Sequence, residues 1–157
     1  KGTSGWLGSW NNNTSPLWIH YDGDSTNENL YGKLYNWYAV NEVSLCPSGW
    51  HIPTSSEWEQ LSESVLPKSL RSTTGWPAGT QATNSSEFSA LPGESIYEFG
   101  EFSGVHGNAQ NDRAFWWASD FDNDNPYAVI LTDDASDDLW IISQAQNNGF
   151  SCRCIKD

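Results

Sequence analysis

The clearest helical pattern in the chain lies between Thr54 and Val65, where apolar side chains recur at helical spacing. Trp58, Leu61 and Val65 stand at i, i+3 and i+7, which places them on one face of a helix. The residues between them are polar. Thr54 is a favourable N-cap and Glu57 follows three residues later, so the two can form a capping box. The pattern therefore predicts a helix that begins after Thr54 and buries Trp58.

Short apolar runs of strand length dominate the last third of the chain. Turns rich in Asp and Asn separate them, at residues 120–126 and 133–138. Runs of this length at this spacing are typical of an antiparallel meander. The sequence predicts four such strands, at 115–119, 127–132, 139–143 and 150–155.

The earlier part of the chain carries weaker signals. Residues 17–21 predict a strand, and residues 31–42 predict a short strand that runs into a helix. No run in residues 67–95 is long enough to predict an element. Two early helices and a late sheet indicate the α+β class, and the length of 157 residues indicates a single domain, 1–157.

Composition narrows the range of partners. The net charge is −13 with only seven Lys and Arg, so no basic patch can neutralise nucleic-acid phosphates or an anionic membrane surface. No apolar run approaches 20 residues, so no membrane span is expected. The chain lacks Met and a signal peptide, and we expect it to be a processed or excised segment. Ten Trp, six Tyr and six Phe predict a core built from large rings.

The chain contains three cysteines, an odd number. Cys46 lies mid-chain, whereas Cys152 and Cys154 lie near the end, and none belongs to a CxxC motif. A single disulfide from Cys46 to the C-terminal strand is favoured, which indicates an oxidising compartment. On an alternating strand Cys152 and Cys154 share a face, so either could reach Cys46. Three reduced core thiols are the alternative.

Five sequence blocks, in order, resemble one family, the Fibrobacter succinogenes major paralogous domain. They are Tyr-Gly-Lys-Leu-Tyr-Asn-Trp (31–37), Cys-Pro-Ser-Gly-Trp-His-Ile-Pro-Thr-Ser-Ser-Glu-Trp-Glu-Gln-Leu (46–61), Phe-Ser-Ala-Leu-Pro-Gly (88–93), Phe-Trp-Trp-Ala-Ser (115–119) and Asn-Gly-Phe-Ser-Cys-Arg-Cys-Ile-Lys-Asp (148–157). The resemblance covers residues 31–157, and residues 1–30 less clearly.

This resemblance carries its own expectations. It implies a C-type-lectin-like fold, distantly similar to formylglycine-generating-type domains, with two helices packed on a small twisted antiparallel sheet and long irregular loops. It implies a bacterial protein that is extracellular or on the cell surface. The family usually ends Gly-Phe-Ser-Val-Arg-Cys, so Cys154 matches the expected partner of Cys46, and Cys152 stands where Val is usual.

The sequence gives little support for a calcium site or for a catalytic site. The calcium-binding motifs of C-type lectins are missing. Asp120, Asp122 and Asp124 have the spacing that begins an EF-hand loop, but the glycine and the acidic twelfth residue of that loop are absent. A solvated acidic turn is the alternative. The three histidines lie outside any nucleophile or metal motif, so we expect no enzyme, and His51 is predicted to be a packed, hydrogen-bonded structural residue.

The strongest candidate site is a binding surface on the C-terminal strands and loops. Exposed aromatic rings among adaptable polar residues are typical of recognition surfaces. Adjacent strand residues point to opposite faces, so at most one of Trp116 and Trp117 can be core on a given face. The alternative is that the tryptophans are core and the acids only solubilise. The predicted ligand-binding residues are Trp116, Trp117, Asp120, Asp122, Asp124, Tyr127, Asp133, Asp137 and Trp140.

These observations predict a non-catalytic, acidic recognition or adhesion module that binds a glycan or a protein. The richness in Asn, Asp, Ser and Tyr is also what diversified variable proteins of this fold show. The alternative is a structural subunit of an extracellular fibre or matrix, which self-associates through residues 1–30 as a strand donated to a neighbour.

Overall fold

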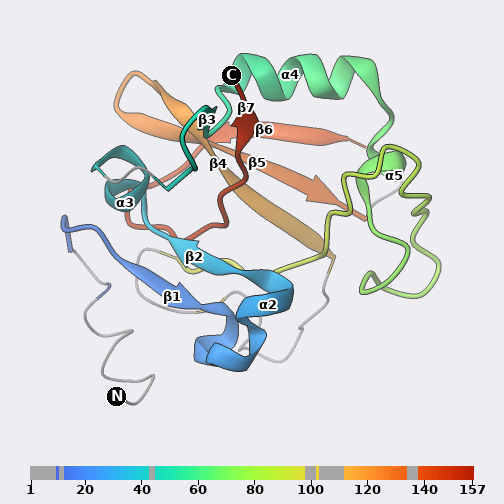
Figure 1. Cartoon of the computed structure of the whole chain (residues 1–157), viewed down its shortest axis with the longest axis horizontal. Helices are drawn as coiled ribbons and strands as arrows, with labels where there is room; N and C mark the ends of the chain where they lie inside the picture. The colour runs from blue at the N-terminus through green and yellow to red at the C-terminus, as the bar shows by residue number, and fades with distance from the viewer. Residues whose placement is uncertain (1–9, 11–12, 43–44, 98–101, 103–111, 134–137) are drawn as a thin grey trace.

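A three-stranded antiparallel sheet forms the centre of the structure, which is a computed structural model (Figure 1). Its strands are β4 (Arg113–Asp122), β5 (Asn125–Thr132) and β6 (Leu139–Ser143), in the order β4-β5-β6. The structure describes residues 10, 13–42, 45–97, 102, 112–133 and 138–157. The first three strands of the predicted meander are therefore confirmed, and the fold is mixed α+β with small antiparallel sheets.

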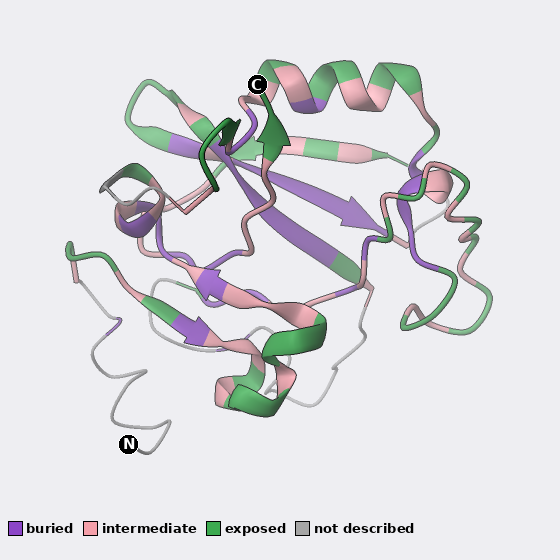
Figure 2. Ribbon diagram, in the orientation of Figure 1, coloured by how far each residue is buried: buried purple, intermediate pink, exposed green. Residues whose placement is uncertain are grey.

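Both faces of the central sheet are covered, because neighbouring side chains of β4 pack into different clusters. Trp116 packs on one face with Trp58 of α4 (Ser55–Ser64). Trp117 packs on the other face with Trp37 of α3 (Trp37–Glu42). One helix thus contributes to the core on each side, and the middle of β4 and β5 is buried throughout (Figure 2).

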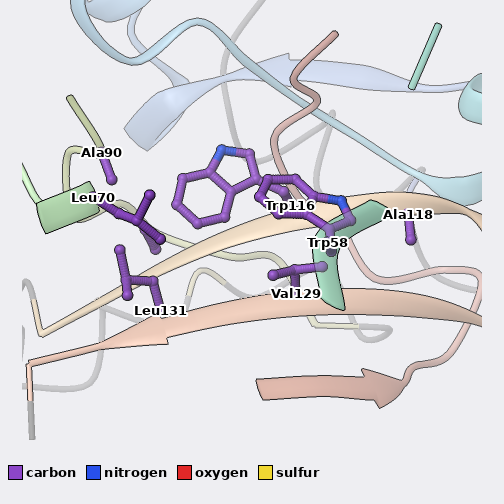
Figure 3. Close-up of a cluster of buried hydrophobic side chains, with 8 residues drawn as sticks. Trp58, Leu70, Ala90, Trp116, Ala118, Val129 and Leu131 are labelled. Carbon is purple, nitrogen blue, oxygen red and sulfur yellow. The ribbon is translucent and has the colours of Figure 1, made fainter. Parts of the chain in front are cut away.

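The cluster on the α4 side is the larger of the two (Figure 3). The rings of Trp58 and Trp116 stack there, with centroids 5.6 Å apart and planes inclined by 26°. Val129 and Leu131 come from β5, and Leu70 from the short helix α5 (Pro67–Leu70). Full burial of each aliphatic side chain contributes roughly 1.5–3 kcal/mol. The prediction that α4 buries Trp58 is confirmed.

Helix α4 begins as its sequence predicts. The Oγ1 of Thr54 accepts a hydrogen bond from the Glu57 backbone N–H at 3.2 Å, and Glu57 Oε2 accepts one from the Thr54 N–H at 2.8 Å, which completes the capping box. Further upstream, the turn that precedes Trp50 needs Gly49, whose φ of +80° is one that other residues rarely adopt. Local residues alone thus specify this start.

A second small sheet lies across from α4, on the far side of the central strands (Figure 1). In it β1 (Trp18–His20) pairs antiparallel with β2 (Lys33–Tyr35). The predicted strand at 17–21 corresponds to β1, and the predicted strand and helix at 31–42 correspond to β2 and α3. Three short helical segments connect β1 to β2: η1 (Tyr21–Gly23), η2 (Ser25–Asn27) and α2 (Glu28–Tyr31).

The predicted fourth strand of the meander, at 150–155, is wrong. Phe150 instead bridges to Tyr35, and Ser151 bridges to Trp116, along the edge of β4 that β5 does not occupy. Only β7 (Ile155–Lys156) is a regular strand, and it pairs with β3 (Trp50–His51). The alternating sequence indicated an extended chain but not its partners, which lie far away along the sequence.

The expected disulfide joins Cys46 to Cys154, with their Cα atoms 5.8 Å apart. It fastens the segment before β3 to the tail just before β7. Cys152 is a free cysteine that packs against the cluster around Trp117, and burial raises the pKa of its thiol. Among the described residues, no helix is long and apolar enough to cross a bilayer.

Candidate functional site

A hollow of about 210 Å³ opens beside Trp140, on the face of the central sheet opposite α4. We call it the Trp140 groove. The described residues that line it come from all three strands of the central sheet, from the tail and from the loop that precedes β4. They are Tyr97, Arg113, Phe115, Ile130, Thr132, Trp140, Ile142, Gln144 and Phe150.

Strand register builds the floor of the groove. Phe115 of β4 lies opposite Ile130 of β5, which in turn lies opposite Trp140 of β6. Residues that face one another across antiparallel strands project their side chains to the same face. Phe150 stacks on Phe115, with centroids 5.4 Å apart and planes inclined by 10°. Because Phe115, Ile130 and Phe150 are buried, the floor is firmly packed.

The rim is aromatic and exposed. Trp140 and Tyr97 each keep 46% of their surface exposed, and Ile142 keeps 37%. An exposed apolar patch around a hollow is typical of a contact surface. Trp and Tyr offer a flat face together with a polar edge, which suits both sugars and protein partners.

Three polar side chains complete the groove. Thr132 is 5% exposed, and its Oγ1 has no hydrogen-bond partner among the described residues. A buried polar atom without a partner costs roughly 1–3 kcal/mol. Arg113 is exposed at the start of β4, and Gln144 follows β6. The groove thus offers a cation, an amide and a hydroxyl around an apolar floor.

The described lining residues include no carboxylate, imidazole or thiol. General acid–base and nucleophilic catalysis usually depend on such groups. The arrangement can therefore stack on flat apolar surfaces, donate hydrogen bonds from Arg113 and exchange them at Gln144 and Thr132.

Two of the predicted site residues lie in the core. Trp116 is 6% exposed and Trp117 is 0% exposed, on opposite faces of the sheet. The Trp117 indole also donates a hydrogen bond to the Tyr35 carbonyl at 2.7 Å. The prediction that the two rings point to opposite faces of the strand is confirmed. Both faces of the sheet are covered, however, so neither ring is available to stack on a ligand.

Tyr127 and Trp140 lie on different sides of the sheet. Tyr127 is half-buried against the cluster beneath α4, whereas Trp140 lines the groove on the other face. In the register of β5 and β6, Tyr127 lies opposite Ser143, while Trp140 lies opposite Ile130. The two aromatic residues that the sequence placed in one site are thus not brought together.

The predicted acidic residues are dispersed. Both carboxylate oxygens of Asp120 accept hydrogen bonds from Ser55, from its backbone N–H at 2.7 Å and its hydroxyl at 2.6 Å. Asp122 accepts from the Asn123 amide at 2.9 Å, in the exposed hairpin turn that also holds Asp124. Within the described chain, no three acidic, His or Cys residues are grouped as metal ligands.

Of the remaining two acids, the structure describes Asp133, which directly follows β5. Asp133 accepts a hydrogen bond from the Thr80 hydroxyl at 3.3 Å. Asp137 lies outside the described residues. None of the predicted acids that the structure describes lines the Trp140 groove.

Sequence reasoning missed most of the groove. Ile142 shares a face with Trp140 through the period-two alternation of a strand, and Arg113 shares one with Phe115, so these pairs were accessible to it. Tyr97 follows a stretch with no predicted element and carried no such signal. The buried Oγ1 of Thr132 has no hydrogen-bond partner among the described residues, which only the folded chain reveals.

Fold and site together define an α+β domain of small antiparallel sheets, held by one disulfide and carrying an aromatic groove. The family model described as the Fibrobacter succinogenes major domain matches residues 7–156, and the chain belongs to this family. The match includes most of the N-terminal segment. Neither the curated proteins nor the solved structures gave a match to the chain.

Proposed function

We propose that this chain is a non-catalytic recognition or adhesion module of a bacterial extracellular or cell-surface protein, and that it binds a glycan or a protein ligand in the Trp140 groove. The supporting observation is the pair of half-exposed rings, Trp140 and Tyr97, around one hollow. The Cys46–Cys154 disulfide supports an oxidising location outside the cytoplasm.

Its fold, in this proposal, is the C-type-lectin-like one. Helices α3 and α4 packed on a small antiparallel sheet, and a disulfide to the last segment of the chain, are consistent with it. Calcium is not required for the proposed contact, because the groove offers rings and hydrogen-bonding groups rather than carboxylates. Diversification of the binding surface remains part of the proposal for the strands and loops around Trp140.

The test is a glycan and protein array screen with the whole chain, followed by affinity measurement of the ligands found. Trp140→Ala should weaken binding at least about tenfold, because truncating a central Trp commonly costs more than 1 kcal/mol. Trp18→Ala is the matched control, since Trp18 is 44% exposed and belongs to the other small sheet. Full affinity in Trp140→Ala would place the binding site elsewhere.

Self-assembly is the alternative function. It was predicted for residues 1–30, of which 1–9, 11 and 12 lie outside the described residues. A different feature favours it: among the described residues, β6 is an edge strand of the central sheet and exposes Trp140 and Ile142. Size-exclusion chromatography separates the two functions, because a monomer at working concentration contradicts assembly.

A further inference from the structure

A second, smaller cavity of about 140 Å³ lies between the η1–α2 region and β4. Tyr21 and Tyr31 line it from that region, Glu94 from the loop before β4, and Arg153 from the tail. Unlike the Trp140 groove, it contains a carboxylate. Nothing in the proposed recognition function uses this cavity.

The carboxylate of Glu94 is incompletely paired. Its Oε2 is buried and has no hydrogen-bond partner in the described part of the chain. The negative charge of Asp22 is close by, and the Asp22 backbone forms a hydrogen bond with Glu94. Burial, and then repulsion by Asp22, raises the pKa of Glu94. The repulsion between Asp22 and Glu94 and the unpaired hydrogen-bond acceptor Oε2 both favour a positively charged hydrogen-bond donor at Oε2.

The walls around Glu94 suit an organic cation. The rings of Tyr21 and Tyr31 stack with centroids 4.1 Å apart, and both line the cavity. Aromatic faces attract ammonium groups. Leu30 and Leu91 add apolar wall, against which an alkyl stem can pack as the stem of a lysine does.

The other charged or titratable groups here do not supply that cation. The guanidinium of Arg153 lies 3.9 Å over the Phe88 ring and donates to the Phe88 carbonyl at 2.5 Å. Burial raises the pKa of the Cys152 thiol, which therefore stays neutral at pH 7. Burial, Glu94 and then Tyr31 raise the pKa of Tyr21, so its phenol is neutral as well. The whole chain, at −13, attracts cations from solution.

We propose that this cavity binds a primary ammonium group on a short apolar stem, with Glu94 as its counter-ion. Small alkylamines and lysine side chains both present this chemistry. The ammonium donates to Oε2 of Glu94 and meets the tyrosine rings, while the stem packs on Leu30 and Leu91. The competing occupant is a water molecule, which would satisfy Oε2 without selecting for charge.

The test is an NMR titration of the whole chain at pH 7 with n-butylammonium, and with n-butanol as the uncharged probe of equal size. We expect saturable shifts at Tyr21, Tyr31 and Glu94 with the amine and none with the alcohol. Glu94→Gln should weaken amine binding at least tenfold. Glu59→Gln, which removes an exposed charge of α4, should leave it unchanged. Trp140→Ala should also leave it unchanged, which separates this site from the Trp140 groove.

Equal binding of alcohol and amine, full affinity in Glu94→Gln, or no saturable shift would each overturn the proposal and leave water as the occupant. A pH series on the unmodified chain gives a second test that does not depend on the folding of a variant. Affinity should fall as the pH is lowered and Glu94 becomes protonated, and a constant affinity from pH 7 down to pH 4 would contradict the proposal. A Gly-Lys-Gly peptide with blocked ends distinguishes the two sources of the ammonium group. Binding of the peptide indicates lysine side chains as ligands. Binding of butylammonium but not of the peptide indicates free alkylamines.

Discussion

His51 ties the start of helix α4 to the end of the chain. Its Nδ1 lies 2.6 Å from Asp157 Oδ1, and its Nε2 lies 3.0 Å from Glu57 Oε1. The hydrogen bonds to Asp157 and then to Glu57 raise the pKa of His51. The predicted hydrogen bonding of His51 is confirmed, but the prediction that it is packed is wrong, because its side chain is 40% exposed. The residue acts as a cationic bridge between two carboxylates.

The raised pKa predicts how stability depends on pH. The unfolded chain loses the His51 proton near the usual value of 6.5, whereas the folded chain retains it to higher pH. The stabilisation is therefore fully present below pH 6.5 and is lost as pH rises through the folded pKa. The melting temperature of the unmodified chain should exceed that of His51→Gln by more at pH 6 than at pH 9.

Protonation of Glu57 at low pH weakens the same bridge. The Thr54 backbone N–H, more than His51, lowers the pKa of Glu57 from its usual 4.5. The Glu57 contribution is present above pH 4.5 and is lost as pH falls through the lowered value. Thermal melts of the unmodified chain and of His51→Gln from pH 3 to 9 measure how the difference in melting temperature depends on pH. A difference in melting temperature that is independent of pH would contradict the bridge.

At the scale of elements, Asp120 lies where β4 contacts the first turn of α4. The Asp120 carboxylate accepts from the Ser55 N–H at the first turn of α4, where the unpaired N–H groups and the helix dipole favour an anion. A strand residue thus supplies a second cap to a helix that already has Thr54. This role differs from the ligand or calcium contact that the sequence suggested for Asp120.

Two alanine variants from the same acidic hairpin test this role. Asp120→Ala should lower the free energy of unfolding by about 1–2 kcal/mol, because a helix N-terminus loses a charged hydrogen-bond acceptor. Asp124→Ala should change it by less than about 0.5 kcal/mol, as expected for an exposed turn side chain. Urea unfolding curves measure both values. Equal changes in the free energy of unfolding in the two variants would show that the hydrogen bonds from Ser55 to Asp120 add no stability.

For the whole molecule, the disulfide is a covalent long-range constraint. Cys46 and Cys154 are 108 residues apart in sequence, so their bond restricts most of the unfolded chain. In the chain-entropy model, closing a loop of this length contributes about 4–5 kcal/mol. The bridge also holds the segment before β3 beside the tail, where β3 and β7 pair through only two residues each. Such a short pair depends on the covalent link.

Removal of the disulfide should therefore destabilise the chain strongly. We expect the double variant Cys46→Ala/Cys154→Ala to melt roughly 10 °C or more below the unmodified chain. Cys152→Val is the matched control: its side chain is of similar size, the thiol forms no disulfide, and the change should cost less than about 1 kcal/mol. Scanning calorimetry of the three proteins compares them. A loss in the control as large as in the double variant would mean that packing near residue 152 matters more than the bridge.

The sequence by itself determined the features that depend on neighbouring residues. Thr54, Glu57 and Trp58 specify the cap and the buried face of α4, because a helix brings residues three and four apart into contact. Short apolar runs separated by turns rich in Asp and Asn likewise specified the first three strands of the meander. The family was also evident from the sequence blocks, and its final Cys154 identified the partner of Cys46.

Only the tertiary structure decided which faces of those elements are exposed. Trp116 and Trp117 are both buried because separate helices reach the two faces of β4, and no local pattern encodes that second cover. The same sheet leaves Trp140 exposed and places Tyr127 on the other side. The tail at 150–155 was extended, as its pattern indicated, but its partners were Tyr35, Trp116 and β3. Strand pairing and burial depend on contacts between residues distant in sequence, and these contacts exist only once the chain has folded.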